Sequence, residues 1–168
     1  MKCLIFSDSH GSTRGILRAL DIHKDAEVVF FLGDGLTDIT GLVDREPRRA
    51  WFYVRGNCDF TSALGTTPVR KLESVTLEGY RIVFTHGDLY GVKYGFDGLE
   101  RLAESSGADV VLFGHTHTPC EKYRPREDGG VYFFNPGSIG QASDGGYSFG
   151  RLSIDEKNIL LSHGRVDY

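Results

Sequence analysis

The sequence predicts an α/β domain, α+β in its C-terminal part, in which two packed β-sheets are flanked by helices. Strand and helix patterns alternate from residue 2 to residue 113, and from residue 120 onward the pattern changes to hairpins. Alternation is typical of parallel strands joined by helices, whereas hairpins join antiparallel strands. In addition, five of the apolar runs are each followed by Asp, Asn or His.

The N-terminal part is expected to contain three buried strands separated by two helices. Ser12 or Thr13 is the expected cap of the first helix, whose apolar residues recur at helical spacing. Pro47 is expected to mark the end of the second helix, because proline cannot continue the helical hydrogen-bond pattern. The expected strands are 2–7, 27–32 and 50–54, and the expected helices are 13–23 and 36–45.

The C-terminal part is expected to contain one further helix and three hairpins. Glu78-Gly79 is the expected turn of the first hairpin, and Gly107 is the expected stop of the helix. A polar loop at 60–68 and a Gly- and Tyr-bearing lip at 89–94 are expected beside the predicted site. The expected strands are 69–77, 80–84, 110–113, 121–124, 131–134, 147–154 and 159–163, and the expected helix is 96–105.

Composition and charge are ordinary for a soluble globular protein. The 168 residues, 40% hydrophobic and 25% charged, suffice for one domain spanning 1–168. A net charge of −4 argues against a large nucleic-acid partner. Cys3, Cys58 and Cys120 form no disulfide pattern and fit a reducing cytoplasm. No signal peptide precedes the first strand and no apolar run reaches membrane-span length, so we expect a cytoplasmic protein without a membrane partner.

Seven residues of metal-binding type stand in five clusters, each after an apolar run. A strand delivers the residues that follow it to one edge of its sheet, so five strand ends can converge on one point. Carboxylate, imidazole and amide groups all bind divalent metals. One such cluster alone is more typical of a turn or a structural histidine, but all five in this order predict a metal site. The seven residues are Asp8, His10, Asp34, Asn57, His86, His115 and His117.

The spacing within the clusters suggests how these ligands converge. Asp8 and His10 are two residues apart, and in an extended segment such residues point the same way, so both could hold one ion. His115 and His117 have the same spacing. Asp34 lies between two glycines that allow a sharp turn, and its two oxygens could bridge two ions.

Seven ligands with one bridging carboxylate provide four protein ligands for each of two ions. Two metals ~3.5–4 Å apart can clamp the attacking and leaving oxygens of an in-line displacement, and can lower the pKa of a bound water from ~15.7 towards ~7. A phosphate ester is the natural substrate for such a clamp. Mixed oxygen and nitrogen ligation leads us to expect two divalent ions, Mn first, with Ni, Zn, Fe or Co as alternatives.

The ordered motif set resembles that of the calcineurin-like metallophosphoesterases. The short chain and Cys58 resemble the small bacterial and archaeal phosphodiesterase branch, which is related to the small subunit of the eukaryotic retromer coat. The resemblance spans residues 2 to about 140. It is carried by Asp8-Ser9-His10, Gly33-Asp34, Gly56-Asn57-Cys58-Asp59, His86-Gly87 and Gly114-His115-Thr116-His117, and is supported by Asn135-Pro136-Gly137-Ser138.

This resemblance implies a four-layer αββα sandwich of two mixed β-sheets flanked by helices. It also implies a division of ligands that the spacing alone does not fix. Asp8, His10 and His117 would hold the first ion. Asn57, His86 and His115 would hold the second, with Asp34 as the bridge.

The motif around Asn57 departs from the family pattern at one position. The family has a histidine where this chain has Cys58, and that histidine is thought to donate a proton or stabilise charge near the leaving group. A thiol of pKa ~8.5 is a poor general acid beside an imidazolium near ~6.5, so we expect good leaving groups to be preferred over alkyl monoesters. Cys58 could instead be a small buried filler or, because hard ligands dominate, less readily a metal ligand. Asp59 is expected to orient an imidazole, unless it is a solvated loop carboxylate.

The leading hypothesis is a phosphodiesterase that hydrolyses small phosphodiesters through a hydroxide activated by two metals, with weak activity on alkyl monoesters. Its expected catalytic residues are Asn57, Cys58, Asp59 and His117, with His117 or a neighbouring histidine positioning the nucleophile. The alternative is a non-catalytic, metal-binding interaction scaffold of the same fold, as the retromer relative suggests. The sequence is compatible with a homo-oligomer.

Overall fold

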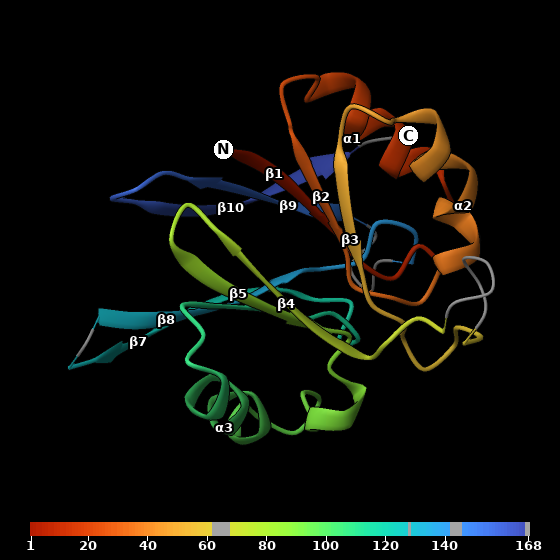
Figure 1. Ribbon diagram of the computed structural model, residues 1–168. Coiled ribbons are helices and arrows are strands. Elements are labelled where there is room, and N and C mark those ends of the chain that lie inside the picture. The colour runs from red at the N-terminus through yellow and green to blue at the C-terminus, as the bar shows by residue number, and fades with distance from the viewer. Residues whose placement is uncertain (62–67, 128, 142–145, 167–168) are drawn as a thin grey trace.

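Four layers of secondary structure make up the fold, in the order helix, sheet, sheet, helix (Figure 1). The computed structural model describes residues 1–61, 68–127, 129–141 and 146–166. Helices α1 (Arg14–Ile22) and α2 (Leu36–Arg45) cover the outer face of one sheet, and α3 (Asp97–Ser106) covers the outer face of the other. The predicted αββα sandwich of two sheets flanked by helices is thereby confirmed.

Each sheet contains parallel strands next to antiparallel ones. In the described part of the chain the first sheet has the order β10-β9-β1-β2-β3, and β1, β2 and β3 run parallel. The second has the order β4-β5-β6-β8-β7, and β5, β6 and β8 run parallel. The strands are β1 Lys2–Phe6, β2 Val28–Phe31, β3 Ala50–Tyr53, β4 Leu72–Leu77, β5 Tyr80–Thr85, β6 Val110–Leu112, β7 Pro119–Arg126, β8 Gly129–Pro136, β9 Tyr147–Ile154 and β10 Ile159–Val166.

The core follows from the alternation of side chains along each strand. In β1, Ile5 packs between the two sheets, whereas Leu4 and Phe6 pack beneath α1 and α2. Phe30 of β2 lies at the centre of the layer between the sheets, with its ring centroid 5.3 Å from that of Phe84. Both faces of the parallel strands are buried, which explains their continuous apolar runs. Truncating one fully buried phenylalanine typically costs about 3–5 kcal/mol, so this layer holds the strand ends firmly in place.

Strand boundaries differ from the expectation in the first and second hairpins. The strand expected at 69–77 begins at Leu72, because the residues before it bond elsewhere: Val69 N–H donates to Thr61 and Arg70 accepts from Arg55 N–H. Strands β7 and β8 extend beyond the expected 121–124 and 131–134, pairing as far as Pro119 with Pro136. Proline is tolerated in β7 because this strand lies at the edge of its sheet.

Several predicted local signals are confirmed and one is wrong. Glu78 and Gly79 both have positive φ in the turn between β4 and β5, and Gly107 ends α3 in the left-handed conformation. Thr13 occupies the N-cap position of α1, but its side chain makes no capping hydrogen bond. The lip expected at 89–94 begins with a short 3₁₀ turn, Asp88–Tyr90. Within the expected polar loop at 60–68, residues 62–67 lie outside the described part of the chain. No helix among the described residues is long and apolar enough to cross a membrane.

Candidate metal centre

The structure brings all seven candidate ligands to one place. They stand on the loops that follow β1, β2, β3, β5 and β6. The strands within each parallel set point the same way, so their carboxyl ends meet at a common edge. Asp8 joins the two halves of the cluster, because its Oδ1 lies 3.2 Å from His117 Nε2 and 4.0 Å from His86 Nε2. The seven are Asp8, His10, Asp34, Asn57, His86, His115 and His117.

One half of the cluster contains Asp8, His10 and His117. Their ligand atoms lie within 4.8 Å of one another, which is close enough to hold one ion. The two Nε2 atoms of His10 and His117 are 3.2 Å apart, and His10 Nε2 is 3.8 Å from Asp8 Oδ1. Three donors from two different strand ends therefore face the same small volume.

The other half contains Asp34, His86 and His115, also with ligand atoms within 4.8 Å. His86 Nε2 lies 3.1 Å from His115 Nδ1 and 3.4 Å from Asp34 Oδ2. Asn57 approaches from the loop after β3, with its Oδ1 3.1 Å from His86 Nε2. His86 is thus surrounded by three further donor atoms.

Backbone carbonyls fix the ring orientation of two histidines. His86 Nδ1 is 2.8 Å from the carbonyl oxygen of Leu32, and His117 Nδ1 is 2.9 Å from that of Gln141. A carbonyl can only accept, so each Nδ1 carries the proton and donates it. In the neutral ring each Nε2 then keeps a lone pair that faces the cluster, which is the tautomer a metal ligand requires.

Asp8 is held by one oxygen and presents the other. Its Oδ2 accepts hydrogen bonds from Ser7 Oγ at 2.5 Å and from the His115 backbone N–H at 3.1 Å. Its Oδ1 is buried and has no hydrogen-bond partner among the described residues. An unpaired buried carboxylate oxygen is costly, and this one faces three imidazoles. Asp8 Oδ1 is therefore positioned to bind a cation.

The backbone of the ligand loops is left-handed. Six described non-glycine residues have positive φ, and five of them are candidate ligands. The expectation that Asp8 and His10, and likewise His115 and His117, point together because they are extended is therefore wrong. Their φ values lie between 44° and 69°, and the turning loops aim the side chains inward. Such residues are uncommon and gather at functional sites. The five are Asp8, His10, Asp34, His115 and His117.

The loop that carries Asp34 lies in close contact with the loop after β3, and only glycine at positions 33 and 56 permits this contact. A Cβ on Gly33 would lie 2.4 Å from the backbone nitrogen of Gly56, and a Cβ on Gly56 would lie 2.0 Å from Asp34 Oδ1. Asp34 Oδ1 accepts the backbone N–H of Cys58 at 2.8 Å. Close approach of the two loops thus positions the carboxylate.

Asp59 does not orient an imidazole as expected. Its two oxygens accept four backbone N–H groups at 2.7–2.9 Å, from Asp34, Gly35, Leu36 and Gly56. Three of these donors belong to the loop that carries Asp34 and opens α2. Asp59 therefore positions a candidate ligand through its backbone and satisfies the start of a helix.

Cys58 lies exposed at the mouth of the cluster, so the interpretation of this residue as a buried filler is wrong. Its Sγ accepts a hydrogen bond from Asn57 Nδ2 at 3.3 Å, which leaves Asn57 Oδ1 directed towards His86. Partial burial and the neighbouring Asp34 raise the pKa of the thiol to about 11. At neutral pH Cys58 is therefore a protonated and weakly acidic group.

The carboxylates and imidazoles of the cluster shift one another's pKa. Burial disfavours charge on Asp34, but His86 and the Cys58 backbone N–H outweigh it and hold the pKa of Asp34 well below its usual range. Burial likewise disfavours charged His86, yet Asp34 and Asp8 raise its pKa. The Asp8 carboxylate, 3.2 Å from its Nε2, raises the pKa of His117, whereas burial and the charge of His86 lower that of His115. Asp34 is therefore ionised at neutral pH, as a carboxylate ligand of a metal must be.

Further residues support the cluster, and only part of this support was predicted. The stretch 135–138, which supported the family resemblance, lies against the cluster, where Ser138 Oγ donates to the Asp8 carbonyl at 2.7 Å. Asn135 Nδ2 donates to the Gly114 carbonyl at 2.9 Å. Asp38 was missed: its Oδ2 accepts from Ser9 Oγ at 2.6 Å and from Gly11 N–H at 2.8 Å. Its place in the first turn of α2 was the only sequence signal.

Two histidines lie outside the cluster. His23 follows α1 and contacts the ring of Phe149 at 5.5 Å between centroids. His163 in β10 bonds to the Asn135 carbonyl at 2.7 Å and stacks on Phe134. Both are structural in this arrangement.

A four-layer αββα sandwich with a His/Asp cluster at its strand ends defines a class of metallohydrolase. The chain belongs to the calcineurin-like phosphoesterase superfamily, whose domain model matches residues 1–164. This membership identifies the chain as a phosphoesterase of a family that binds divalent metals.

Individual relatives support the same family. The chain is 35% identical over 141 residues to the probable metallophosphoesterase YsnB of Bacillus subtilis, covering 83% of this chain and 75% of that protein. It is 29% identical to the phosphodiesterase YfcE of Escherichia coli, covering 95% and 91%. A predicted phosphoesterase from Streptococcus pneumoniae superposes with a TM-score of 0.76 at 25% identity, covering 96% and 87%. The Zn²⁺ complex of Vps29 from Entamoeba histolytica shares the fold, with a TM-score of 0.74 at 19% identity over 99% of each chain. These likenesses confirm the small bacterial and archaeal branch related to the retromer subunit.

Proposed function

We propose that the chain is a phosphodiesterase that hydrolyses small phosphodiesters at a centre of two divalent ions. The observation that carries the proposal is the convergence of two triads of ligand atoms, each within 4.8 Å. The first triad is Asp8, His10 and His117, and the second is Asp34, His86 and His115.

The donor atoms fit divalent cations. Two pairs of imidazole nitrogens face each other, His10 Nε2 with His117 Nε2 at 3.2 Å and His86 Nε2 with His115 Nδ1 at 3.1 Å. At these distances only one nitrogen of each pair can carry a proton that points to the other. The unpaired Oδ1 of Asp8 lies beside one of these pairs. A cation in each half would satisfy all of these lone pairs at once, and mixed nitrogen and oxygen ligation suits Mn, Fe, Co, Ni or Zn. We take Mn as the first choice.

Asp34 is the best candidate for the bridge between the ions. Its carboxylate belongs to the triad with His86 and His115, and it also lies within 4.8 Å of His10 and Cys58 ligand atoms. It therefore reaches both halves of the cluster. We assign Asp8, His10 and His117 to the first ion, and His86, His115 and Asn57 to the second.

When bound, two such ions supply the Lewis acidity that activates a water and neutralises charge on the phosphate oxygens. The protein residues contribute position. The Leu32 and Gln141 carbonyls hold the His86 and His117 rings with Nε2 directed into the site. Asp59 fixes the loop of Asp34 without entering the site. Among the predicted catalytic residues, Asn57 and His117 therefore act as ligands and positioning groups.

Cys58 supports a preference for good leaving groups. A thiol whose pKa is raised to about 11 is a weak proton donor. An alkyl alkoxide needs a proton as it departs, whereas an aryl oxide leaves without one. We therefore propose efficient hydrolysis of aryl-like phosphodiesters and weak activity on alkyl monoesters.

The alternative is a non-catalytic scaffold of the same fold. The likeness to Vps29 concerns the fold and does not distinguish the two functions. A scaffold has no chemical need for seven intact donors with fixed histidine tautomers, which favours the enzyme.

The deciding experiment compares an aryl phosphodiester with the matching aryl monoester, using metal-stripped protein to which Mn, Ni, Zn, Co or Mg is returned. We expect metal-dependent turnover that favours the diester. Asp34→Ala should lower it by more than about 100-fold, because even loss of a group behind a metal ligand costs about 10–100-fold. Asp44→Ala, at an exposed position on α2, is the matched control. Binding of two ions without turnover for any metal would favour the scaffold.

A further inference from the structure

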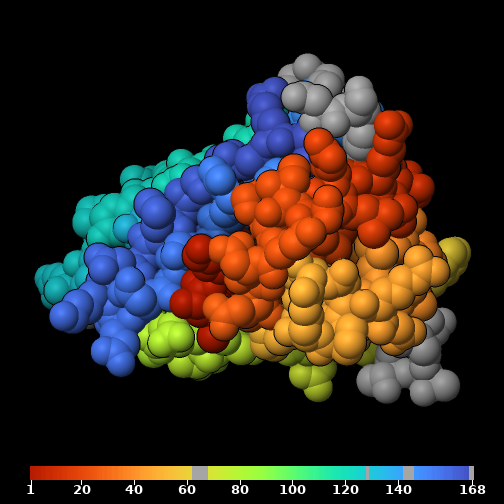
Figure 2. Space-filling model, turned by 90° about the horizontal axis from the view of Figure 1, so that it is seen from above, coloured from red at the N-terminus to blue at the C-terminus, as the bar shows by residue number. Residues whose placement is uncertain are grey.

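A pocket of about 310 Å³ lies far from the metal centre, at the opposite end of β1. It is lined by Lys2, Cys3 and Leu4, whereas Asp8 follows the carboxyl end of the same strand. Figure 2 shows that the helical layer leaves β9, β10 and the start of β1 at the surface. The pocket occupies this bare part of the sheet.

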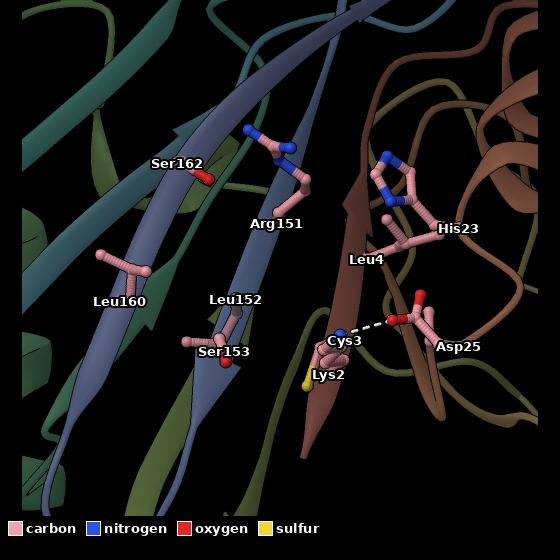
Figure 3. A pocket seen from close by; sticks show the side chains of 11 residues that line it. Lys2, Cys3, Leu4, His23, Asp25, Arg151, Leu152, Ser153, Leu160 and Ser162 are labelled. Carbon is pink, nitrogen blue, oxygen red and sulfur yellow. Dashed lines mark hydrogen bonds and ion pairs between the residues drawn. The ribbon is translucent and has the colours of Figure 1, made fainter.

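Strand register builds the floor of the pocket in two rows (Figure 3). Lys2 pairs with Ser153, which pairs with Leu160. In the next row on the same face, Leu4 pairs with Arg151, which pairs with Ser162. We call this site the Arg151 pocket. Its wall is formed by His23 and Asp25, from the segment after α1.

The charges of the Arg151 pocket do not cancel. Lys2 and Asp25 form an ion pair at 2.5 Å across one side. The guanidinium of Arg151 makes no hydrogen bond or ion pair within the described part of the chain, and its charge acts on His23. One cation is therefore left over on a protein whose net charge is −4.

The other polar groups near Arg151 are mostly donors. Ser162 is the cross-strand neighbour of Arg151, and Ser153 stands two residues along β9 on the same face; neither hydroxyl has a side-chain partner among the described residues. A planar guanidinium matches carboxylate and phosphate groups with two parallel hydrogen bonds. Beside these donors Leu4 provides an apolar floor, and Leu160 is 66% exposed.

We propose that the Arg151 pocket binds a small organic anion. Its carboxylate or phosphate group is held by the Arg151 guanidinium and by the hydroxyls of Ser153 and Ser162. A short apolar body lies on Leu160, the cross-strand neighbour of Ser153. A volume of about 310 Å³ suits a ligand of this size. The site is separate from the metal centre and does not depend on the proposed reaction.

The test is residue-resolved NMR of the isotope-labelled full chain with Zn²⁺ supplied, titrated with benzoate, phenylphosphonate, inorganic phosphate and benzyl alcohol. Both organic anions should give saturable shifts at Ser153 and Ser162, and benzyl alcohol should give none there. Shifts confined to the ligand loops around Asp8 would report the metal centre and would overturn the proposal.

Three variants separate the contributions to binding. Arg151→Gln should weaken both organic anions at least tenfold, whereas Arg45→Gln, at an exposed position at the end of α2, should leave them unchanged. Leu160→Ser should weaken phenylphosphonate several-fold while inorganic phosphate stays the same. Because Leu160 is exposed, Leu160→Ser tests the pocket without disturbing the hydrophobic core. Equal affinity in wild type and Arg151→Gln would refute the assignment.

Discussion

Replacing Cys58 with histidine should change which esters the protein hydrolyses. Cys58 lies at the mouth of the site, where its Sγ is within 4.8 Å of ligand atoms of His10 and Asp34. This exposed position can accommodate an imidazole side chain, which can carry a proton near neutral pH. We therefore expect Cys58→His to accelerate alkyl monoesters, whose leaving groups need that proton.

The size of the effect follows from the acidity of the two groups. The pKa of the Cys58 thiol is raised to about 11 by partial burial and by Asp34. An imidazolium has a pKa of ~6.5, so the new acid is stronger by ~4–5 units. General acid catalysis contributes ~10²–10⁴-fold in enzymes. Because this position is exposed and screened by water, we expect the lower end, an increase of ~10² for alkyl esters.

The assay is kcat/KM for an alkyl and an aryl monoester at one pH, with the same metal loading for each variant. Cys58→Ser is the control, because it removes the thiol without supplying an acid. The alkyl-to-aryl ratio should rise in Cys58→His and stay low in Cys58→Ser. If the two variants have the same ratio, Cys58 has no part in leaving-group preference.

Three further outcomes are expected. Asp59→Asn should destabilise the fold by about 1–3 kcal/mol in chemical denaturation and weaken metal binding in calorimetry, because it disturbs hydrogen bonds to four partly buried backbone N–H groups. Unchanged values for both would contradict its positioning role. Lys93 acts electrostatically on two candidate ligands, so Lys93→Ala should raise KM for an anionic phosphodiester several-fold and flatten its salt dependence, unlike the exposed control Lys157→Ala. In metal-free protein, the raised pKa of His86 contributes stability that is fully present below pH ~6.5 and is lost as the pH rises through the raised pKa. The lowered pKa of Asp34 contributes stability that is lost as the pH falls and the carboxylate is protonated. Metal affinity should instead rise with pH, since binding displaces protons; thermal denaturation and metal titration from pH 5 to 8 distinguish these opposite trends.

The layers and the location of the site could be predicted because they depend on patterns repeated along the chain. Apolar runs such as Val28–Phe31 are buried on both faces, so their length and composition are enough to identify them. Metal-binding residues directly after such runs are brought together by the parallel strands.

The parts that could not be predicted depend on contacts between distant segments. Asp59 was expected to orient a nearby ring, but three of its partners lie 23–25 residues earlier in the chain. Asp38 reaches the loop of Ser9 across 29 residues. The start of β4 at Leu72 depends on bonds from the preceding residues to the loop after β3. No local periodicity reports such long-range hydrogen bonds.

The left-handed ligand loops limit how this centre could be moved to another protein. Five candidate ligands have φ between 44° and 69°, values that extended strands and helices do not provide. Grafting seven side chains onto a scaffold of regular strands would therefore aim most of them away from the ions. A successful transplant would need the loop backbones themselves, together with the buried carboxylates and close glycine contacts that hold them.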